Sequence, residues 1–111
     1  MNWIPLSNPN QLADIVLRSN KVPCLIFKHS TRCNISSLAK YRLEDDWKFS
    51  MEEIEPYYLD LLQYKDISNT ISEQFQVWHE SPQILLIVNG ECIYDASHLD
   101  ITVAELQESL T

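Results

Sequence analysis

The segment that most constrains the fold of this chain is residues 22–38, VPCLIFKHSTRCNISSL. Its first residues place apolar side chains on both faces of an extended chain, which is typical of a strand in the middle of a sheet. Lys28 is expected to end this strand. Apolar residues then recur at helical spacing, at Ile35, Leu38, Ala39 and Leu43. The pattern predicts that Cys33 lies at or just before a helix N-terminus, at the C-terminal end of the strand.

Such a location favours thiol chemistry. Only the thiolate is a useful sulfur nucleophile, and a free cysteine, with a pKa of about 8.5, is mostly protonated at neutral pH. The first turn of the predicted helix offers unpaired N–H groups from Asn34, Ile35 and Ser36, together with the positive end of the helix dipole. Arg32 adds a positive charge beside Cys33. We therefore predict a lowered pKa for Cys33, in the range of about 3.5–7.5 that is typical of reactive cysteines at helix N-termini.

Cys33 begins a C-x-x-S motif that ends at Ser36. A second cysteine at that position could close an internal disulfide, whereas a hydroxyl can hydrogen-bond a thiolate but cannot form a disulfide. The chemistry is therefore expected to be monothiol, and a mixed disulfide on Cys33 would be resolved by an external thiol or by another cysteine of the chain. The four residues leave a second reading open, because the motif also occurs by chance and many strand-end cysteines are inert.

The length and composition indicate one folded domain, which we assign to residues 1–111. Hydrophobic residues make up 45% of the chain, which argues for a globule with a core. No apolar run approaches the ~18 residues of a membrane span, and the first residues lack the features of a signal peptide. We therefore expect a cytoplasmic protein without a membrane partner. Three cysteines without paired spacing fit free thiols in a reducing compartment.

The charge is unevenly distributed along the chain. The formal net charge of −8 argues against a nucleic-acid partner, because phosphate contacts need a basic surface. Residues 1–43 carry +5 and residues 44–111 carry −13. A locally positive surface around Cys33 would lower its pKa and attract an anionic small thiol. Alternatively, Lys40 and Arg42 simply lie on a solvated helix face, because folding can interleave the two halves.

The first half of the chain contains two further predicted elements. Residues 3–6 are compatible with a short strand. Asn8 as N-cap, with Pro9 at the first helical position, begins a helix with a buried apolar stripe. The helix that follows Cys33 is expected to run to about Asp45. Three successive acidic residues lie there, where the negative end of a helix dipole disfavours them, and we expect a kink or an exit from the helix at this point.

The second half is read in the same way. A strand is predicted at residues 57–62, with Pro56 at its start, and a helix begins at Asp66 or Ser68. Strands at residues 84–88 and 91–95 are joined by a two-residue turn, Asn89-Gly90. Residues 102–105 form a capping box for the last helix. The tryptophans at helical positions, Trp47 and Trp78, are interpreted as packing residues.

The predicted order is β-α-β-α-β-α-β-β-α, an α/β fold. Right-handed crossovers would place helices on both faces of a mixed central sheet that is parallel at first and ends in an antiparallel hairpin. With a cysteine after the second strand and a proline at the start of the fourth, the chain resembles the thioredoxin fold over nearly its whole length.

Two segments carry a more specific resemblance. Residues 27–36, FKHSTRCNIS, and residues 79–83, HESPQ, resemble the signature segments of the YtxJ-type monothiol bacilliredoxins. The resemblance implies an enzyme that removes bacillithiol from S-bacillithiolated client proteins, with no bound cofactor and with bacillithiol or a similar small thiol as co-substrate. Where the family has proline after the cysteine, this chain has Asn34. Asn34 adds an N–H donor near the sulfur but loosens the turn, and it could equally be a neutral substitution.

The resemblance also implies roles for individual residues. Cys33 would attack the bacillithiol sulfur of the mixed disulfide, release the client thiol and keep bacillithiol as its own adduct. Pro82 matches the cis-proline that faces the cysteine in this fold, and the Ser81 backbone would pair with the client like an added strand. His29 could support the thiolate as an imidazolium or be a solvated loop residue, and Glu80 could orient the substrate or be an ordinary loop carboxylate. The malyl carboxylates of bacillithiol are compatible with the basic loop.

The remaining candidates are expected to be structural. Cys24 is interpreted as a small buried apolar residue in a strand, and Cys92 as a structural residue of the hairpin, although either could resolve an adduct on Cys33. His79 and His98 are expected to be structural or exposed, and no cysteine and histidine spacing suggests a metal site.

Three hypotheses about function remain at this point. The first is the monothiol oxidoreductase. The second is an iron–sulfur carrier resembling the monothiol glutaredoxins, with Cys33 and a small thiol holding a cluster at a dimer interface. The third is a non-enzymatic adaptor with a thioredoxin-like fold that uses the groove at Pro82 or the acidic face.

Overall fold

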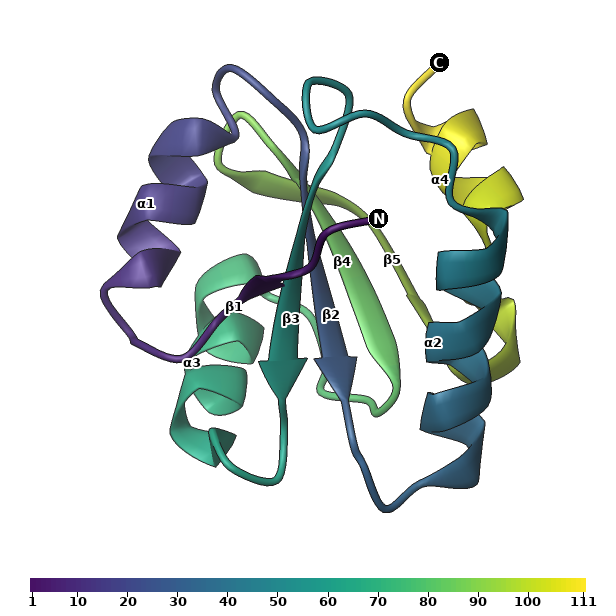
Figure 1. Ribbon diagram of the computed structural model, residues 1–111. Helices are drawn as coiled ribbons and strands as arrows, with labels where there is room; N and C mark the ends of the chain where they lie inside the picture. The colour runs from purple at the N-terminus through teal and green to yellow at the C-terminus, as the bar shows by residue number, and fades with distance from the viewer.

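The computed structural model describes residues 1–111 and has the predicted order of elements. A short 3-10 helix, η1, which the sequence did not predict, lies between the last strand and the last helix (Figure 1). The bounds are β1 (Ile4–Pro5), α1 (Gln11–Arg18), β2 (Cys24–His29), α2 (Asn34–Asp46), β3 (Glu55–Asp60), α3 (Lys65–Phe75), β4 (Gln83–Val88), β5 (Glu91–Ser97), η1 (His98–Asp100) and α4 (Val103–Ser109).

The five strands form one mixed sheet in the order β1-β3-β2-β4-β5. β1, β3 and β2 run parallel to one another, β4 is antiparallel to β2, and β5 is antiparallel to β4. β2 is therefore central, with β3 on one side and β4 on the other, as its two apolar faces predicted. No helix is long and apolar enough to cross a membrane.

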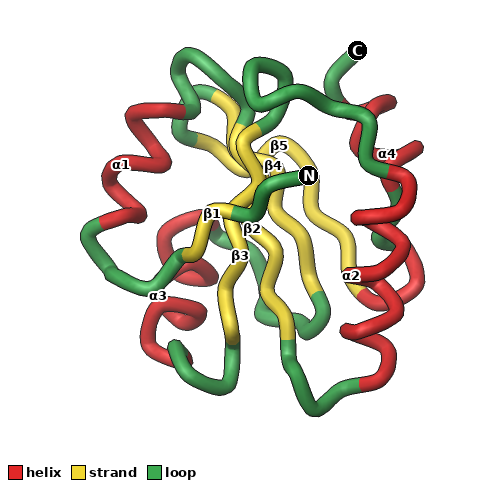
Figure 2. The backbone as a smooth tube through the Cα atoms, in the orientation of Figure 1, coloured by secondary structure: helices red, strands yellow, loops and turns green.

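Helices cover both faces of this sheet. α1 and α3 lie on one face and α2 and α4 on the other, as the ribbon and the backbone tube both show (Figures 1 and 2). Each face has its own hydrophobic core, because the side chains of a strand alternate between the two faces. Cys24 and Ile26 of β2 join the core under α1 and α3, whereas Leu25 and Phe27 join the core under α2 and α4.

Two local predictions in the first half of the chain are wrong. Asn8 does not cap α1, because its side-chain Oδ1 accepts a hydrogen bond from the Asn10 N–H at 2.9 Å in a turn, and the helix begins at Gln11. Lys28 does not end β2, which continues to His29 with every residue buried. Pairing with β3 through His29 and with β4 through Lys28 extends the strand beyond its apolar run.

The buried stripe of α2 matches the predicted one only in part. Ile35 and Leu38 are exposed, and the buried residues are Ser36, Ala39 and Leu43. Small side chains at residues 36 and 39 let the helix approach the sheet closely, and the apolar residues beside them remain in solvent. Apolar spacing alone therefore placed Ala39 and Leu43 correctly but missed the buried Ser36 in the first turn.

The second half shows similar shifts. β3 spans Glu55–Asp60 rather than residues 57–62, with Pro56 as its second residue. α3 ends at Phe75 because Gln76 adopts a left-handed conformation with φ of 57°. Trp78 is consequently outside the helix and 91% exposed, so its predicted packing role is wrong. Trp47 does pack, half-buried, against Phe49.

The hairpin and the last helix follow the prediction. Asn89 and Gly90 both have positive φ, 51° and 77°, as a two-residue turn between antiparallel strands requires. The side-chain Oγ1 of Thr102 accepts a hydrogen bond from the Glu105 N–H at 3.2 Å at the start of α4. β5 is longer than predicted and runs to Ser97.

Candidate functional site

Cys33 is the N-cap residue of α2, at the C-terminal end of β2. It is a free, half-buried thiol in an extended conformation, with φ of −109° and ψ of 121°. The Cys33 N–H donates to the Ser30 carbonyl at 3.2 Å and the Cys33 carbonyl accepts from the Ser37 N–H at 3.0 Å. No side chain caps the helix, and the N–H groups of residues 34–36 donate to no backbone carbonyl. These free donors beside the sulfur can stabilise a thiolate.

Ser36 and His29 form a hydrogen-bonded pair behind the cysteine. The Ser36 side chain is fully buried, its Oγ lies 2.6 Å from His29 Nδ1, and it accepts the Ser30 N–H at 3.0 Å. Because that N–H can only donate, the Ser36 hydroxyl is free to donate to His29. The hydroxyl is thus engaged with His29 and Ser30 rather than with Cys33.

His29 is a buried strand residue and not a solvated loop residue. It is 4% exposed, at the end of β2, with ring centroids 5.5 Å from those of both Phe27 and Tyr58. Burial, reinforced by the positive charge of Lys40, lowers its pKa below the ordinary value of 6.5. The lowered pKa favours the neutral imidazole, and the burial shows that the predicted solvated loop residue is wrong.

The Ser81–Pro82 peptide bond is cis, as the resemblance implied. Gln83 braces this loop, because its side-chain Nε2 donates to the Trp78 carbonyl at 2.9 Å. The Pro82 carbonyl accepts a hydrogen bond from the His98 backbone N–H at 3.0 Å. Glu80 Oε2 lies 3.8 Å from His98 Nε2. The backbone N–H and C=O of Ser81 make no hydrogen bond within the protein. They are the groups that an added strand would use.

Lys28 and His79 form a second polar cluster that the sequence did not reveal as such. Lys28 has no exposed surface, and burial lowers its pKa to about 8. Its Nζ lies 3.2 Å from the Ser68 carbonyl, 2.9 Å from Ser72 Oγ and 3.3 Å from His79 Nδ1. The available signal was the period of two along β2, which places Lys28 on the α3 face if the strand continues to His29.

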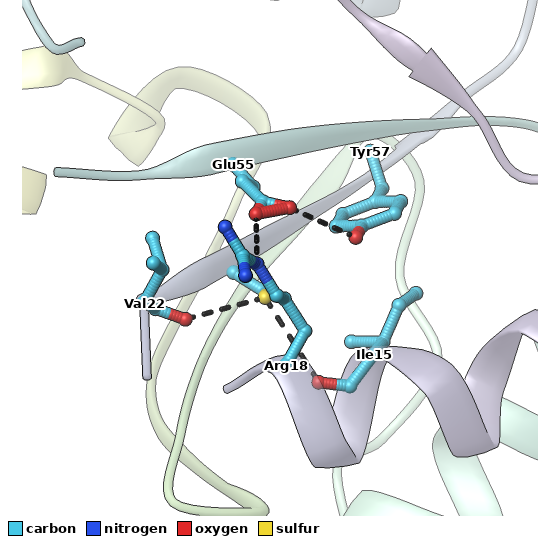
Figure 3. Close-up of polar contacts among 6 residues, drawn as sticks. Ile15, Arg18, Val22, Glu55 and Tyr57 are labelled. Carbon is cyan, nitrogen blue, oxygen red and sulfur yellow. Dashed lines mark hydrogen bonds and ion pairs between the residues drawn. The ribbon is translucent and has the colours of Figure 1, made fainter. Parts of the chain in front are cut away.

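The other two cysteines lie away from this arrangement. Cys24 is buried in β2, and its Sγ is 3.4 Å from the Val22 carbonyl and 3.9 Å from the Ile15 carbonyl; both contacts are dashed in Figure 3. Burial raises its pKa to about 12 and that of Cys92 to about 11. Both thiols are protonated at neutral pH, which fits the structural roles predicted for them.

Three of the six basic residues in the first half of the chain are paired or buried. Arg18 pairs with Glu55 at 2.5 Å, Lys40 pairs with Glu44 at 2.8 Å, and Lys28 is buried. Folding interleaves the two halves, because β3 of the acidic half lies beside β2. Arg32, next to Cys33, is exposed. No group of three histidine, cysteine or acidic side chains is arranged to hold a metal ion.

Known proteins resemble this chain in both sequence and architecture. The family model of the monothiol bacilliredoxins matches residues 4–106. A solved structure with a thioredoxin fold and a provisional oxidoreductase assignment is 33% identical, covers 97% of this chain and 93% of its own, and superposes with a TM-score of 0.80.

More distant thioredoxins share the fold. The thioredoxin of Malassezia sympodialis is 14% identical with a TM-score of 0.76, covering 98% of this chain and 88% of its own. The thioredoxin of Fasciola hepatica is 15% identical with a TM-score of 0.73, covering 96% and 94%. The predicted thioredoxin-like fold is thereby confirmed.

Proposed function

The chain belongs to the monothiol bacilliredoxin family, a family of thiol redox proteins, and from that premise we propose that it removes bacillithiol or a similar small thiol from protein mixed disulfides. Cys33 is the nucleophile. The co-substrate is the small thiol, the partners are S-thiolated client proteins, and the proposed place of action is the cytoplasm, where reductants keep client thiols free.

The observation that carries this proposal is the surroundings of Cys33. It is the one cysteine at a helix N-terminus with free backbone donors, and it lies in the segment whose C-x-x-S motif offers no second sulfur. Cys24 and Cys92 have raised pKa values, so they are poor resolving thiols at neutral pH. These features support intermolecular resolution by a small thiol.

The proposed reaction has two exchange steps. The Cys33 thiolate attacks the bacillithiol sulfur of the mixed disulfide, a new S–S bond forms, and the client leaves as a thiolate. A second small thiol, as its thiolate, then attacks the bacillithiol sulfur on Cys33, releasing Cys33 and the small-thiol disulfide. Electrons balance in each step, because one disulfide is broken for each one formed. Arg32 and the N–H groups of Asn34, Ile35 and Ser36 stabilise the thiolate, and the Ser81 backbone, beside Glu80 and Pro82, receives the client.

The test is intact-mass spectrometry after incubation with a bacillithiolated client, with a glutathionylated client in parallel. We expect an adduct of bacillithiol mass on the protein and a freed client thiol. Cys33→Ser should abolish the adduct, and Cys92→Ser is the matched control that should retain it. If Cys33 stays unmodified and the client remains capped, the transfer mechanism is wrong and the iron–sulfur carrier and the adaptor become the leading hypotheses.

A further inference from the structure

The buried ammonium of Lys28 has no part in the proposed exchange steps. It is fully buried, at the end of the strand that leads to Cys33, and no carboxylate pairs with it. A buried charge without an ion partner is costly, and an apolar side chain of similar volume usually gives equal or greater stability. The question is therefore what the hydrogen bonds of this buried ammonium hold in place.

The contacts of Lys28 join three separate segments. From β2 its Nζ reaches the Ser68 carbonyl and Ser72 Oγ, which are one turn apart on α3, and His79 Nδ1 on the loop that leads to Pro82. Ser68 Oγ also lies 3.3 Å from His79 Nδ1. A lysine ammonium has three donors and no acceptor, so these three acceptors match its capacity.

The same contacts fix the state of the His79 ring. An ammonium can only donate, so His79 Nδ1 accepts and the neutral ring carries its proton on Nε2. Burial and the positive charge of Lys28 lower the pKa of His79, and the charge of Glu80 opposes that shift. Two residues later the chain reaches Ser81, whose backbone groups are free for pairing.

We propose that Lys28 is a positioning residue that anchors the His79–Pro82 segment, through His79 Nδ1, in the geometry that presents the Ser81 backbone to a client beside Cys33. This inference rests on the proposed function, in which the client pairs with Ser81. Lys28 touches no reacting atom. Its role is to hold the client-binding segment to the strand that carries the nucleophile.

The central test compares Lys28→Met with the wild type, and Lys65→Met, an exposed lysine of α3, is the matched control. Because a lost buried hydrogen bond is worth about 1–3 kcal/mol, we expect KM for the bacillithiolated client to rise about tenfold with kcat within about twofold. Alkylation of Cys33 by iodoacetamide, which needs no client-binding segment, should change less than about twofold. An unchanged KM, or an equal fall in the alkylation rate, would overturn the inference.

Two histidine variants separate anchoring from direct contact. His79→Asn keeps a polar acceptor at the position of Nδ1 and should retain most of the wild-type KM. His79→Gln places its amide at the position of Nε2, loses the acceptor for Lys28 and should resemble Lys28→Met. The opposite order would show that the outer nitrogen contacts the client and that Lys28 is not the anchor.

A readout without turnover keeps this inference separate from the transfer reaction. In Lys28→Met, the NMR pKa of His79 should rise, and hydrogen exchange over residues 76–82 should accelerate. If the wild type fails to transfer bacillithiol, the proposed function fails, while these two measurements still decide whether Lys28 anchors the loop. No change in either measurement would refute the anchor even in an active enzyme.

Discussion

The two faces of the sheet differ in the kind of polar group that they bury. The face under α1 and α3 holds ionisable groups: Cys24, Lys28, Tyr57 and Glu55. Glu55 pairs with the exposed Arg18 (Figure 3). The face under α2 and α4 holds an aromatic cluster around Phe27 and one neutral pair, His29 with Ser36. Lys28 and His29 are consecutive residues, and the alternation of β2 sends them to opposite faces.

The difference shows how one strand end serves two parts of a site. On the α2 face, the His29–Ser36 pair fixes the first turn of the helix that follows Cys33. On the α3 face, Lys28 reaches the loop that leads to Pro82. The helix that begins after Cys33 and the loop that leads to Pro82 are therefore each held by one of two consecutive residues of β2. The first pair joins two neutral side chains by a hydrogen bond, whereas the second cluster holds a buried ammonium.

The largest expected effect concerns the thiols. Both cysteines outside the site pack on the α1/α3 face, and burial holds their pKa values at about 12 and about 11. At pH 8 we expect iodoacetamide to label Cys33 at least about a hundredfold faster than Cys24 or Cys92, because only the thiolate reacts. Peptide mass spectrometry of the native protein measures the three rates. Labelling of Cys24 at a rate comparable to that of Cys33 would show that burial on this face does not lower the reactivity of its thiols.

The next effect concerns the charge of Lys28. Its pKa falls from 10.5 unfolded to about 8 folded, so between these values the unfolded chain binds more protons and this residue makes stability rise with pH. At 1.36 kcal/mol per pKa unit, the stability of the wild type relative to Lys28→Met should rise by about 3 kcal/mol between pH 8 and pH 10.5. Urea unfolding of both proteins across this range measures the difference, in which the other titrating groups cancel. A difference independent of pH would contradict the lowered pKa.

A smaller effect is expected on the other face. Ser36→Ala leaves the Ser30 N–H and His29 Nδ1 without their partner, so the free energy of unfolding should fall by about 1–3 kcal/mol. Thermal or urea unfolding measures it, and the exposed neighbour Ser37→Ala is the control. The double variant His29→Phe with Ser36→Ala removes both partners and should recover part of the loss. Equal stability of the two single variants would mean that the pair does not hold the turn.

The smallest effect concerns Asn34. It is exposed at the first position of α2, its N–H donates to no backbone carbonyl, and Cys33 already has the extended conformation that precedes proline. Asn34→Pro should therefore stabilise the protein by about 0.4–1 kcal/mol. Denaturant unfolding and the Cys33 alkylation rate, measured together, separate this effect on stability from an effect on the thiol. Destabilisation would show that the Asn34 N–H or side chain is needed.

The sequence predicted the order of elements, the central strand, the hairpin turn and the position of Cys33. These features rest on local patterns: two apolar faces for β2, positive φ at Asn89-Gly90, and a helix pattern directly after the cysteine. Each of these patterns lies within a few neighbouring residues, so it can be recognised without knowing which distant segments the residues contact.

Only the tertiary structure decided the surroundings of that cysteine. Pairing with β3 and β4 carried β2 through Lys28 to His29, buried both side chains and gave His29 a neutral ring. The same packing engaged the Ser36 hydroxyl with His29 and left Ile35 and Trp78 in solvent. A side chain's burial, and with it its pKa, depends on segments far away in the chain. The sequence of β2 and α2 by itself thus determined where the thiol lies, and the packing of α3 and β3 determined which groups hold its site together.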